Sequence, residues 1–143
     1  MRADRGQAVK GRMILVRTKL APSVRHGIGL FADQFIPKGT ATWQYDAIFD
    51  TSYSNEEIAK MSPPAREQFL KYAYFDDTLG KYVLCFDDQR FINHCADNPN
   101  IKCTPHRDIA ARDIAPGEEL VCDYSGFDPK WFERRAIDPA TFR

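Results

Sequence analysis

The sequence predicts a mostly β, α+β fold in a single domain. Short runs rich in branched residues recur along the chain, separated by turns that contain Pro and Gly, which is the pattern of short β-strands. One stretch, over residues 54–72, changes to helical spacing with capping residues. No linker divides the 143 residues, a length typical of one domain.

The first half begins with a polar segment, residues 1–12, which predicts a flexible arm. Residues 13–18 are rich in branched side chains and predict a strand, and a second strand is expected at Ile28–Ala32. A Pro-x-Gly corner at 37–39 predicts a turn, after which residues 41–49 return as another strand.

Two short helices are expected next. Ser54 with Glu57 three residues later forms a capping box, and Ser62 can cap a second helix with Pro63 at its first position, where a missing N–H is harmless. A turn follows at 77–80. Further strands are expected at 82–86, 100–105, 108–112 and 119–123, the last after a turn at 115–117, and a short helix at 128–133.

Composition excludes several functions. Twenty basic and twenty acidic residues cancel, so no overall positive charge exists to bind nucleic acid directly. No segment reaches the roughly 20 apolar residues that span a bilayer, and the charged N-terminus lacks a secretory signal. Four cysteines without C-x-x-C spacing favour a reduced, intracellular protein. We expect a cytoplasmic location, with a nuclear or host-nuclear one left open.

A glycine-containing loop precedes the second strand. In Arg25-His26-Gly27-Ile28-Gly29, the backbone can approach a ligand closely where a Cβ would block it. No third glycine follows and no helix begins there, so the loop is not a dinucleotide-binding fingerprint. Taken alone, the tripeptide also fits a tight turn.

A second motif runs from Arg90 through Asn93 and His94 to Asn100. The Asn93 amide can donate and accept hydrogen bonds, and His94 offers two ring nitrogens as well as its backbone groups. Such mixed partners suit a cofactor with an amino group and an adenine edge. An Asn-His pair before Asn-Pro is also common in an ordinary turn.

The third motif is the strand 119–123 with Tyr124 after it. A strand ending in Asp-Tyr also fits a core strand with a hydrogen-bonded tyrosine. Upstream, Trp43-Gln44-Tyr45-Asp46-Ala47 places another tyrosine after a predicted strand.

In this order, the motifs resemble the signature of SET-domain protein-lysine methyltransferases, over roughly residues 13–124. The resemblance implies short, β-clip-like sheets around a pseudoknot, with a small helical insertion. The chain is similar to the minimal, single-domain type of bacteria and viruses, without zinc-binding flanking segments. Residues 125–143 are then expected to be a C-terminal extension that packs over the cofactor site.

The resemblance also implies the activity and the site. The activity is S-adenosyl-L-methionine-dependent transfer of a methyl group to a lysine side-chain amine of a protein or peptide, in a narrow channel lined by tyrosines. The implied cofactor-binding residues are Arg25, Gly27, Ile28, Gly29, Asn93, His94 and Tyr124. The implied catalytic residues are Tyr124 and Tyr45, and the implied channel residues are Tyr45, Cys122 and Tyr124.

The chain departs from the family pattern at several positions. Cys95 stands where relatives have Ser, one extra residue lies between Asn93 and Asn100, and Ala47 replaces a glycine. Ala47 and the irregular loop 93–100 motivate an alternative, a non-catalytic SET-like domain that binds S-adenosylmethionine or a peptide without turnover. Cys122 stands where many relatives carry Phe or Tyr, and its smaller size predicts room for di- or trimethyl-lysine.

Two other chemistries fit the residues less well. The spacings of His94, Cys95, Cys103 and His106 match no standard zinc pattern, so we predict no metal site. A Cys–His hydrolase would need Cys95 to face a histidine, and nothing marks a nucleophile turn or an oxyanion hole. Some minimal relatives are dimers, so a homodimer is left open, and no membrane partner is expected.

Overall fold

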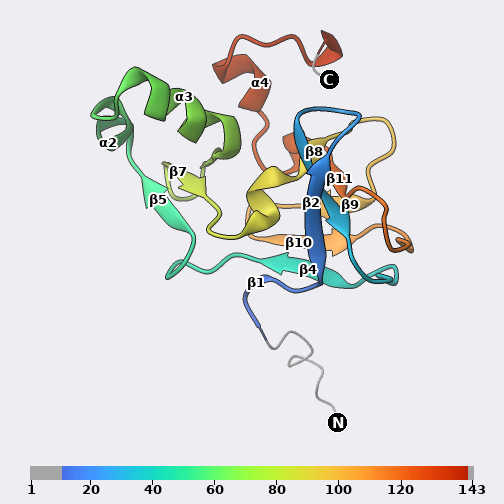
Figure 1. Ribbon diagram of the computed structural model, residues 1–143. Coiled ribbons are helices and arrows are strands. Elements are labelled where there is room, and N and C mark those ends of the chain that lie inside the picture. Colours follow the sequence, from blue (N-terminus) through green and yellow to red (C-terminus); the bar gives the residue numbers. More distant parts are fainter. Residues whose placement is uncertain (1–10, 142–143) are drawn as a thin grey trace.

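The computed structural model describes residues 11–141, which form a mostly β, α+β domain as the sequence predicts (Figure 1). Residues 1–10 of the predicted arm lie outside the described range. The strands make sheets of six, two and three strands. The strands are β1 (Met13–Ile14), β2 (Thr18–Pro22), β3 (Ile28–Ala32), β4 (Ala41–Gln44), β5 (Thr51–Tyr53), β6 (Tyr74–Asp76), β7 (Lys81–Leu84), β8 (Asn93–His94), β9 (Ile101–Cys103), β10 (Arg107–Ala110) and β11 (Val121–Cys122). The α-helices are α2 (Asn55–Ala59), α3 (Pro63–Tyr72) and α4 (Trp131–Arg134), with 3₁₀ turns at Asp88–Phe91, Tyr124–Gly126 and Pro139–Thr141.

The six-stranded sheet has the order β1-β4-β10-β9-β11-β8. The short strand β11 lies between β8 and β9 and runs parallel to both, with Val121 opposite Asn93 and Cys122 opposite His94. The loop 95–100 joins β8 to β9 and must therefore cross β11. This crossing places Asn93 and His94 beside the strand that ends just before Tyr124, as the resemblance implies.

The β2–β3 hairpin docks on the segment that leads into β11. The backbone N–H of Leu120 donates to the carbonyl of Leu30 over 2.7 Å, and that of Ala32 donates to the carbonyl of Glu118 over 2.9 Å. The tip of this hairpin, residues 23–27, carries the first part of the glycine loop 25–29, whose last two residues begin β3. The hairpin thus carries the glycine loop to the end of the sheet where β8 lies (Figure 1).

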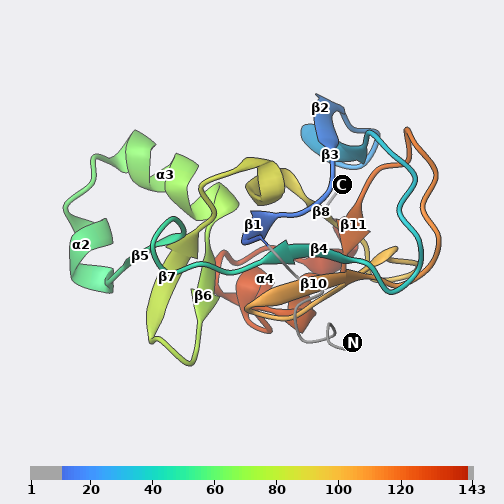
Figure 2. The same ribbon diagram turned by 90° about the horizontal axis from the view of Figure 1, so that it is seen from below.

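The helical insertion lies on the other side of the domain from the β2–β3 hairpin (Figures 1 and 2). Both predicted helix starts are confirmed. Ser54 and Glu57 form the capping box of α2, and the Ser62 side chain accepts from Ala65 N–H at the start of α3, where Pro63 is the first residue. The helices pack through Ile58, Phe69 and Ala73 against the sheet of β5, β6 and β7.

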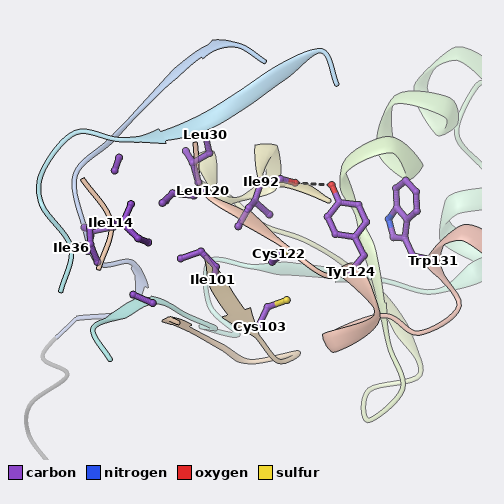
Figure 3. Close-up of a cluster of buried hydrophobic side chains, with 13 residues drawn as sticks. Leu30, Ile36, Ile92, Ile101, Cys103, Ile114, Leu120, Cys122, Tyr124 and Trp131 are labelled. Carbon is purple, nitrogen blue, oxygen red and sulfur yellow. Dashed lines mark hydrogen bonds between the residues drawn. The ribbon is translucent and has the colours of Figure 1, made fainter. Parts of the chain in front are cut away.

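The main core fills the space between the hairpin and the six-stranded sheet. It contains fully buried branched residues from both, such as Leu30, Ile101 and Leu120 (Figure 3). Tyr124 and Trp131 lie at one edge of this core, so the C-terminal segment closes it. Within residues 11–141, no helix combines the length and apolar character needed to cross a bilayer.

Several predicted strands are longer than the observed ones, and two of them differ in their course as well. The strand predicted at 13–18 is split, because β1 pairs with β4 whereas β2 starts a different sheet. The strand predicted at 41–49 ends at Gln44. The Asp46 N–H donates to the Asp50 carboxylate, and the Asp46 side chain accepts from Ile48 N–H, so these two acids bend the chain into a turn. The predicted C-terminal helix starts later, at Trp131.

Candidate active site

The glycine loop has two positions where a side chain would not fit the backbone. Gly27 has a φ of 51°, a left-handed conformation that L-residues rarely adopt. A Cβ on Gly29 would lie 2.4 Å from Oε2 of Glu119, closer than real contacts allow. Glu119 therefore approaches the loop backbone directly, and this close packing requires glycine.

Asn93 fastens this loop to the sheet. Its side-chain Nδ2 donates to the carbonyl oxygens of His26 at 3.0 Å and Ile28 at 3.3 Å, and to Oε2 of Glu119 at 2.9 Å. The Ser23 hydroxyl, at the other end of the loop, also donates to the Glu119 carboxylate. Hydrogen bonds through Asn93 and Glu119 thus hold the loop against the sheet, and Asn93 itself is buried. Sequence reasoning missed the role of Glu119, although the residue stands in the Gly117-to-Tyr124 motif.

His94 is held in one tautomer. Its Nδ1 accepts the backbone N–H of Tyr124 over 3.1 Å, so the neutral ring carries its proton on Nε2. The ring centroid lies 5.0 Å from that of Tyr124 and 4.8 Å from that of Phe132. Partial burial lowers the pKa of His94 below 6.5, against the opposing effect of Asp123 and with the help of Arg25.

Tyr124 is buried where the β11 segment ends. Its hydroxyl donates to the carbonyl oxygen of Ile92 over 2.7 Å (Figure 3). Burial raises the pKa of Tyr124 well above 10, so the phenol stays protonated at neutral pH. Its ring lies 4.9 Å from Trp131 and 5.3 Å from Phe127, which locks the side chain in place.

Two cavities meet at this tyrosine. The first, called the narrow cavity here, offers water-sized molecules about 40 Å³ and is lined mainly by aromatic and apolar side chains. The second, the open cavity, offers about 660 Å³ and reaches the glycine loop and Asn93. The residues that line both are Lys71, Tyr72, Arg90, Ile92, Tyr124 and Trp131. The two cavities therefore share a wall formed by Tyr124 and its neighbours.

A third hollow, of about 620 Å³, lies on the other side of the glycine loop, where Arg25 and His26 face His94 and Asp97. Pro139 and Ala140 of the C-terminal segment complete its wall. The described part of the segment 125–143 thus borders the narrow and open cavities through Trp131 and the third hollow through Pro139. That it covers a cofactor stays a prediction.

Most of the predicted site residues come together, but three of them, Gly29, Tyr45 and Cys122, line none of the three hollows. Tyr45 packs on the cluster of Trp43 and Tyr74, with its ring 4.8 Å from His106, and is not among the residues that line the three hollows. Cys122 is completely buried in the main core (Figure 3) and does not line them either. The structure therefore gives no support to a size effect of Cys122 on the narrow cavity.

The structure also adds residues that the sequence did not single out. Tyr74 on β6 lines the narrow cavity and donates its hydroxyl to the carbonyl of Pro105 over 2.7 Å. Trp43 and Asp108 line the same cavity from neighbouring strands. Only the pairing of β4 with β10 brings these two together, so no local pattern could have found them. Among residues 11–141, no three His, Cys, Asp or Glu side chains gather to hold a metal ion.

The protonation of His94 predicts a pH dependence of stability. The pKa of His94 is lowered in the folded protein, so on acidification the unfolded chain binds its proton first, from about pH 6.5 downwards. The free energy of unfolding should therefore fall as the pH drops below 6.5 and level off below the folded-state pKa. Urea unfolding between pH 7.5 and 5 measures this. In His94→Gln, whose amide oxygen can accept the same hydrogen bond, the fall should be smaller; an unchanged fall would contradict the assignment.

Comparison with known proteins identifies the sequence pattern. The sequence model of the SET domain matches residues 27–125. No curated protein sequence matches the chain significantly. Similar solved structures include an apo ctPRC2 with two substitutions in Ezh2, at a TM-score of 0.62 and 23% identity, covering 84% of this chain and 16% of that one.

Two further structures show the same fold. One is ctPRC2 in complex with a trimethylated and a methionine-substituted histone H3, at a TM-score of 0.57 and 24% identity over 76% of this chain and 14% of that one. The other is an active polycomb repressive complex 2 in the basal state, at a TM-score of 0.59 and 24% identity, covering 76% of this chain and 15% of that one. The chain spans only 14–16% of the length of these proteins.

Proposed function

Since the chain belongs to the SET-domain family, we propose that it is an S-adenosylmethionine-dependent protein-lysine methyltransferase. The observation that carries this proposal is the meeting of two cavities at Tyr124 and Ile92. A cofactor in the open cavity and a lysine in the narrow cavity would approach each other from opposite sides. Displacement at a methyl carbon needs this in-line arrangement, and holding the reactants in it supplies much of the rate.

The open cavity and the third hollow, both of which border the glycine loop, fit such a cofactor. Their volumes, about 660 and 620 Å³, lie in the range of small-molecule sites. Gly27 leaves the loop backbone accessible, Asn93 offers an amide oxygen for an amino group, and His94 offers its Nε2–H. When bound, the cofactor supplies a methyl group on a positively charged sulfur.

The narrow cavity suits the methylene chain of a lysine. Phe127, Trp131 and Tyr74 supply apolar and aromatic wall. A lysine ammonium has an ordinary pKa near 10.4, so its neutral form costs about 4–5 kcal/mol to populate at pH 7. An apolar wall and a neighbouring positive sulfur both lower that pKa, which increases the fraction of the nucleophilic amine.

Tyr124 orients the reacting groups in this proposal. Its proton is committed to the carbonyl oxygen of Ile92, so the phenol oxygen keeps lone pairs for other partners. That oxygen and the Ile92 carbonyl can accept weak C–H···O contacts from a partly positive methyl. Because burial raises the pKa of Tyr124, the phenol stays protonated and does not serve as the base. Its role is to orient the reacting groups.

A transfer assay tests the function. The chain is incubated with S-adenosylmethionine carrying a labelled methyl group and with a mixed pool of lysine-containing proteins that includes histone H3. We expect label on lysine side chains, identified by mass spectrometry of the labelled peptides. Cofactor binding, measured separately by calorimetry, separates the two readings: binding without transfer would favour the non-catalytic domain, and neither binding nor transfer would overturn both.

A further inference from the structure

Besides its apolar wall, the narrow cavity contains a group of buried polar side chains. Gln89 and Asp108 line it, and both are buried, with 7% and 2% of their surface exposed. Trp43 and Arg90 also line it. The buried Trp43 Nε1 and Arg90 Nε have no hydrogen-bond partner among the described residues. Buried polar atoms without partners are rare in folded proteins, so their position here indicates a site for a polar ligand or for water.

Asp108 occupies the centre of this polar group. It lies on β10 directly opposite Trp43 of β4, so in the antiparallel sheet both side chains project from the same face. Its Oδ2 accepts from Nε2 of Gln89 over 2.6 Å. One carboxylate can accept about four hydrogen bonds, so the bonds from Gln89 and from the Thr104 backbone leave Asp108 able to accept more.

The surroundings of Asp108 keep its carboxyl group basic. Burial raises its pKa to about 8, although the hydrogen bonds from Gln89 and the Thr104 backbone lower it. The other titratable groups that face it come from the cavity wall and from the neighbouring strands. They are Lys71, Tyr72, Tyr74, Cys85, Arg90, Cys103, Cys122 and Tyr124.

We propose that Asp108 accepts the proton that the substrate ammonium must lose before methyl transfer, an inference that rests on the proposed function. The proton moves from the lysine nitrogen to an oxygen of the ionised Asp108 carboxylate, directly or through a water in the narrow cavity. The nitrogen lone pair then forms the new N–C bond as the C–S bond breaks, and the electron pair of that bond stays on sulfur. Asp108 returns its proton to solvent between turnovers.

The other groups in the narrow cavity are less suited to this role. Among the described residues that line it, Asp108 is the only carboxyl group, and no histidine is present. Burial raises the pKa of Tyr74, Cys85 and Tyr124 above their ordinary values, so these groups stay protonated. A carboxyl group with a pKa near 8 matches an amine whose own pKa is lowered toward neutrality, the condition for efficient proton transfer.

The pH profile of kcat/KM tests the proposal. The substrate is a synthetic peptide around a lysine labelled in the transfer assay. With Asp108 as acceptor, kcat/KM should rise about tenfold per unit up to about pH 8 and then stay level towards the lysine pKa near 10.4. In Asp108→Asn the bend near 8 should vanish. At pH 8, kcat/KM of this variant should lie on the order of 100-fold below that of wild type. Above pH 8 it should keep rising about tenfold per pH unit.

Asp50→Asn is the matched control. Asp50 is also a buried carboxyl group whose pKa is raised by burial, but it lies outside the narrow cavity and accepts from the backbone of Asp46 and Phe86. This variant should keep the bend near pH 8. A wild-type profile without the bend, or a bend that survives in Asp108→Asn, would overturn the assignment while the lysine methyltransferase function stands.

Proton release on binding gives a second readout that needs no turnover. Calorimetry in buffers of different ionisation enthalpy counts the protons released when the peptide binds at pH 7.5. The ammonium should favour ionised Asp108, so wild type should release protons. A peptide with norleucine in place of the lysine should release none, and Asp108→Asn should release fewer protons than wild type with the lysine peptide; equal release from both proteins would contradict the proposal. Absence of methyl transfer by the unsubstituted chain would overturn this proposal together with the proposed function.

Discussion

Tyr124→Phe is expected to lower methyl transfer on the order of 100-fold, while cofactor binding stays within about threefold. The Phe ring can keep the packing against Phe127 and Trp131. What disappears is the hydroxyl and its 2.7 Å hydrogen bond to the Ile92 carbonyl, the pair that lies on the wall between the two cavities. Single-turnover transfer with the labelled cofactor measures the rate, and calorimetry measures the affinity.

Tyr82→Phe is the control for this variant. Tyr82 lies on β7, packs against Phe69 and Phe75, and lines neither cavity. It should transfer methyl groups at the wild-type rate. The orienting role of Tyr124 would be refuted if the Tyr124→Phe protein were folded, bound cofactor normally and transferred at the same rate as Tyr82→Phe.

Asn93→Ala should have the second largest effect, on both stability and cofactor affinity. The substitution removes the donor to the His26 and Ile28 carbonyls and to Glu119, so the glycine loop loses its attachment to the sheet. Losing these three part-buried hydrogen bonds, one of them to a carboxylate, should lower the free energy of unfolding by about 2–4 kcal/mol. Loss of the amide oxygen and of the ordered loop should weaken cofactor binding about 100-fold, as measured by calorimetry.

Asn100→Ala separates stability from binding. Asn100 is buried like Asn93, donates to the Glu119 carbonyl over 2.8 Å and accepts from Val121 N–H over 2.9 Å, but it does not line the cavities. We expect a similar loss of stability, with cofactor affinity within about threefold of wild type for the folded protein. Equal weakening of binding in both variants would mean that Asn93 acts only through folding.

Local chemistry made much of the fold predictable. The capping box at Ser54 and the Ser62-Pro63 helix start depend on residues a few positions apart, so the sequence alone identifies them. The strands β5, β6 and β8 were not predicted, and each is only two or three residues long. β6 pairs with the next strand, β7, across the predicted turn, whereas β8 depends on a partner distant in the chain, as in the match of Asn93 with Val121. The pseudoknot crossing was expected only through the family resemblance.

The site residues also divide into those that local motifs predict and those that only the pairing of distant strands brings together. Asn93, His94 and Tyr124 stand in motifs and were predicted, and the structure places all three beside the open cavity or the adjoining hollow. Trp43 and Asp108 could not be found this way, because each looks like an ordinary strand residue until β4 and β10 pair. The same sequence reasoning placed Tyr45 and Cys122 in the channel by analogy, and the structure buries Cys122 in the core instead.

The central claim is that cofactor and lysine reach Tyr124 from two different cavities. A crystal structure of the chain with S-adenosylhomocysteine and an acceptor peptide tests it most directly. The account predicts the cofactor product in the open cavity, against the Gly27-to-Gly29 loop and Asn93, with the lysine in the narrow cavity and its nitrogen facing the sulfur across Tyr124 and Ile92. Both ligands in one cavity, or a lysine nitrogen remote from Tyr124, would contradict it.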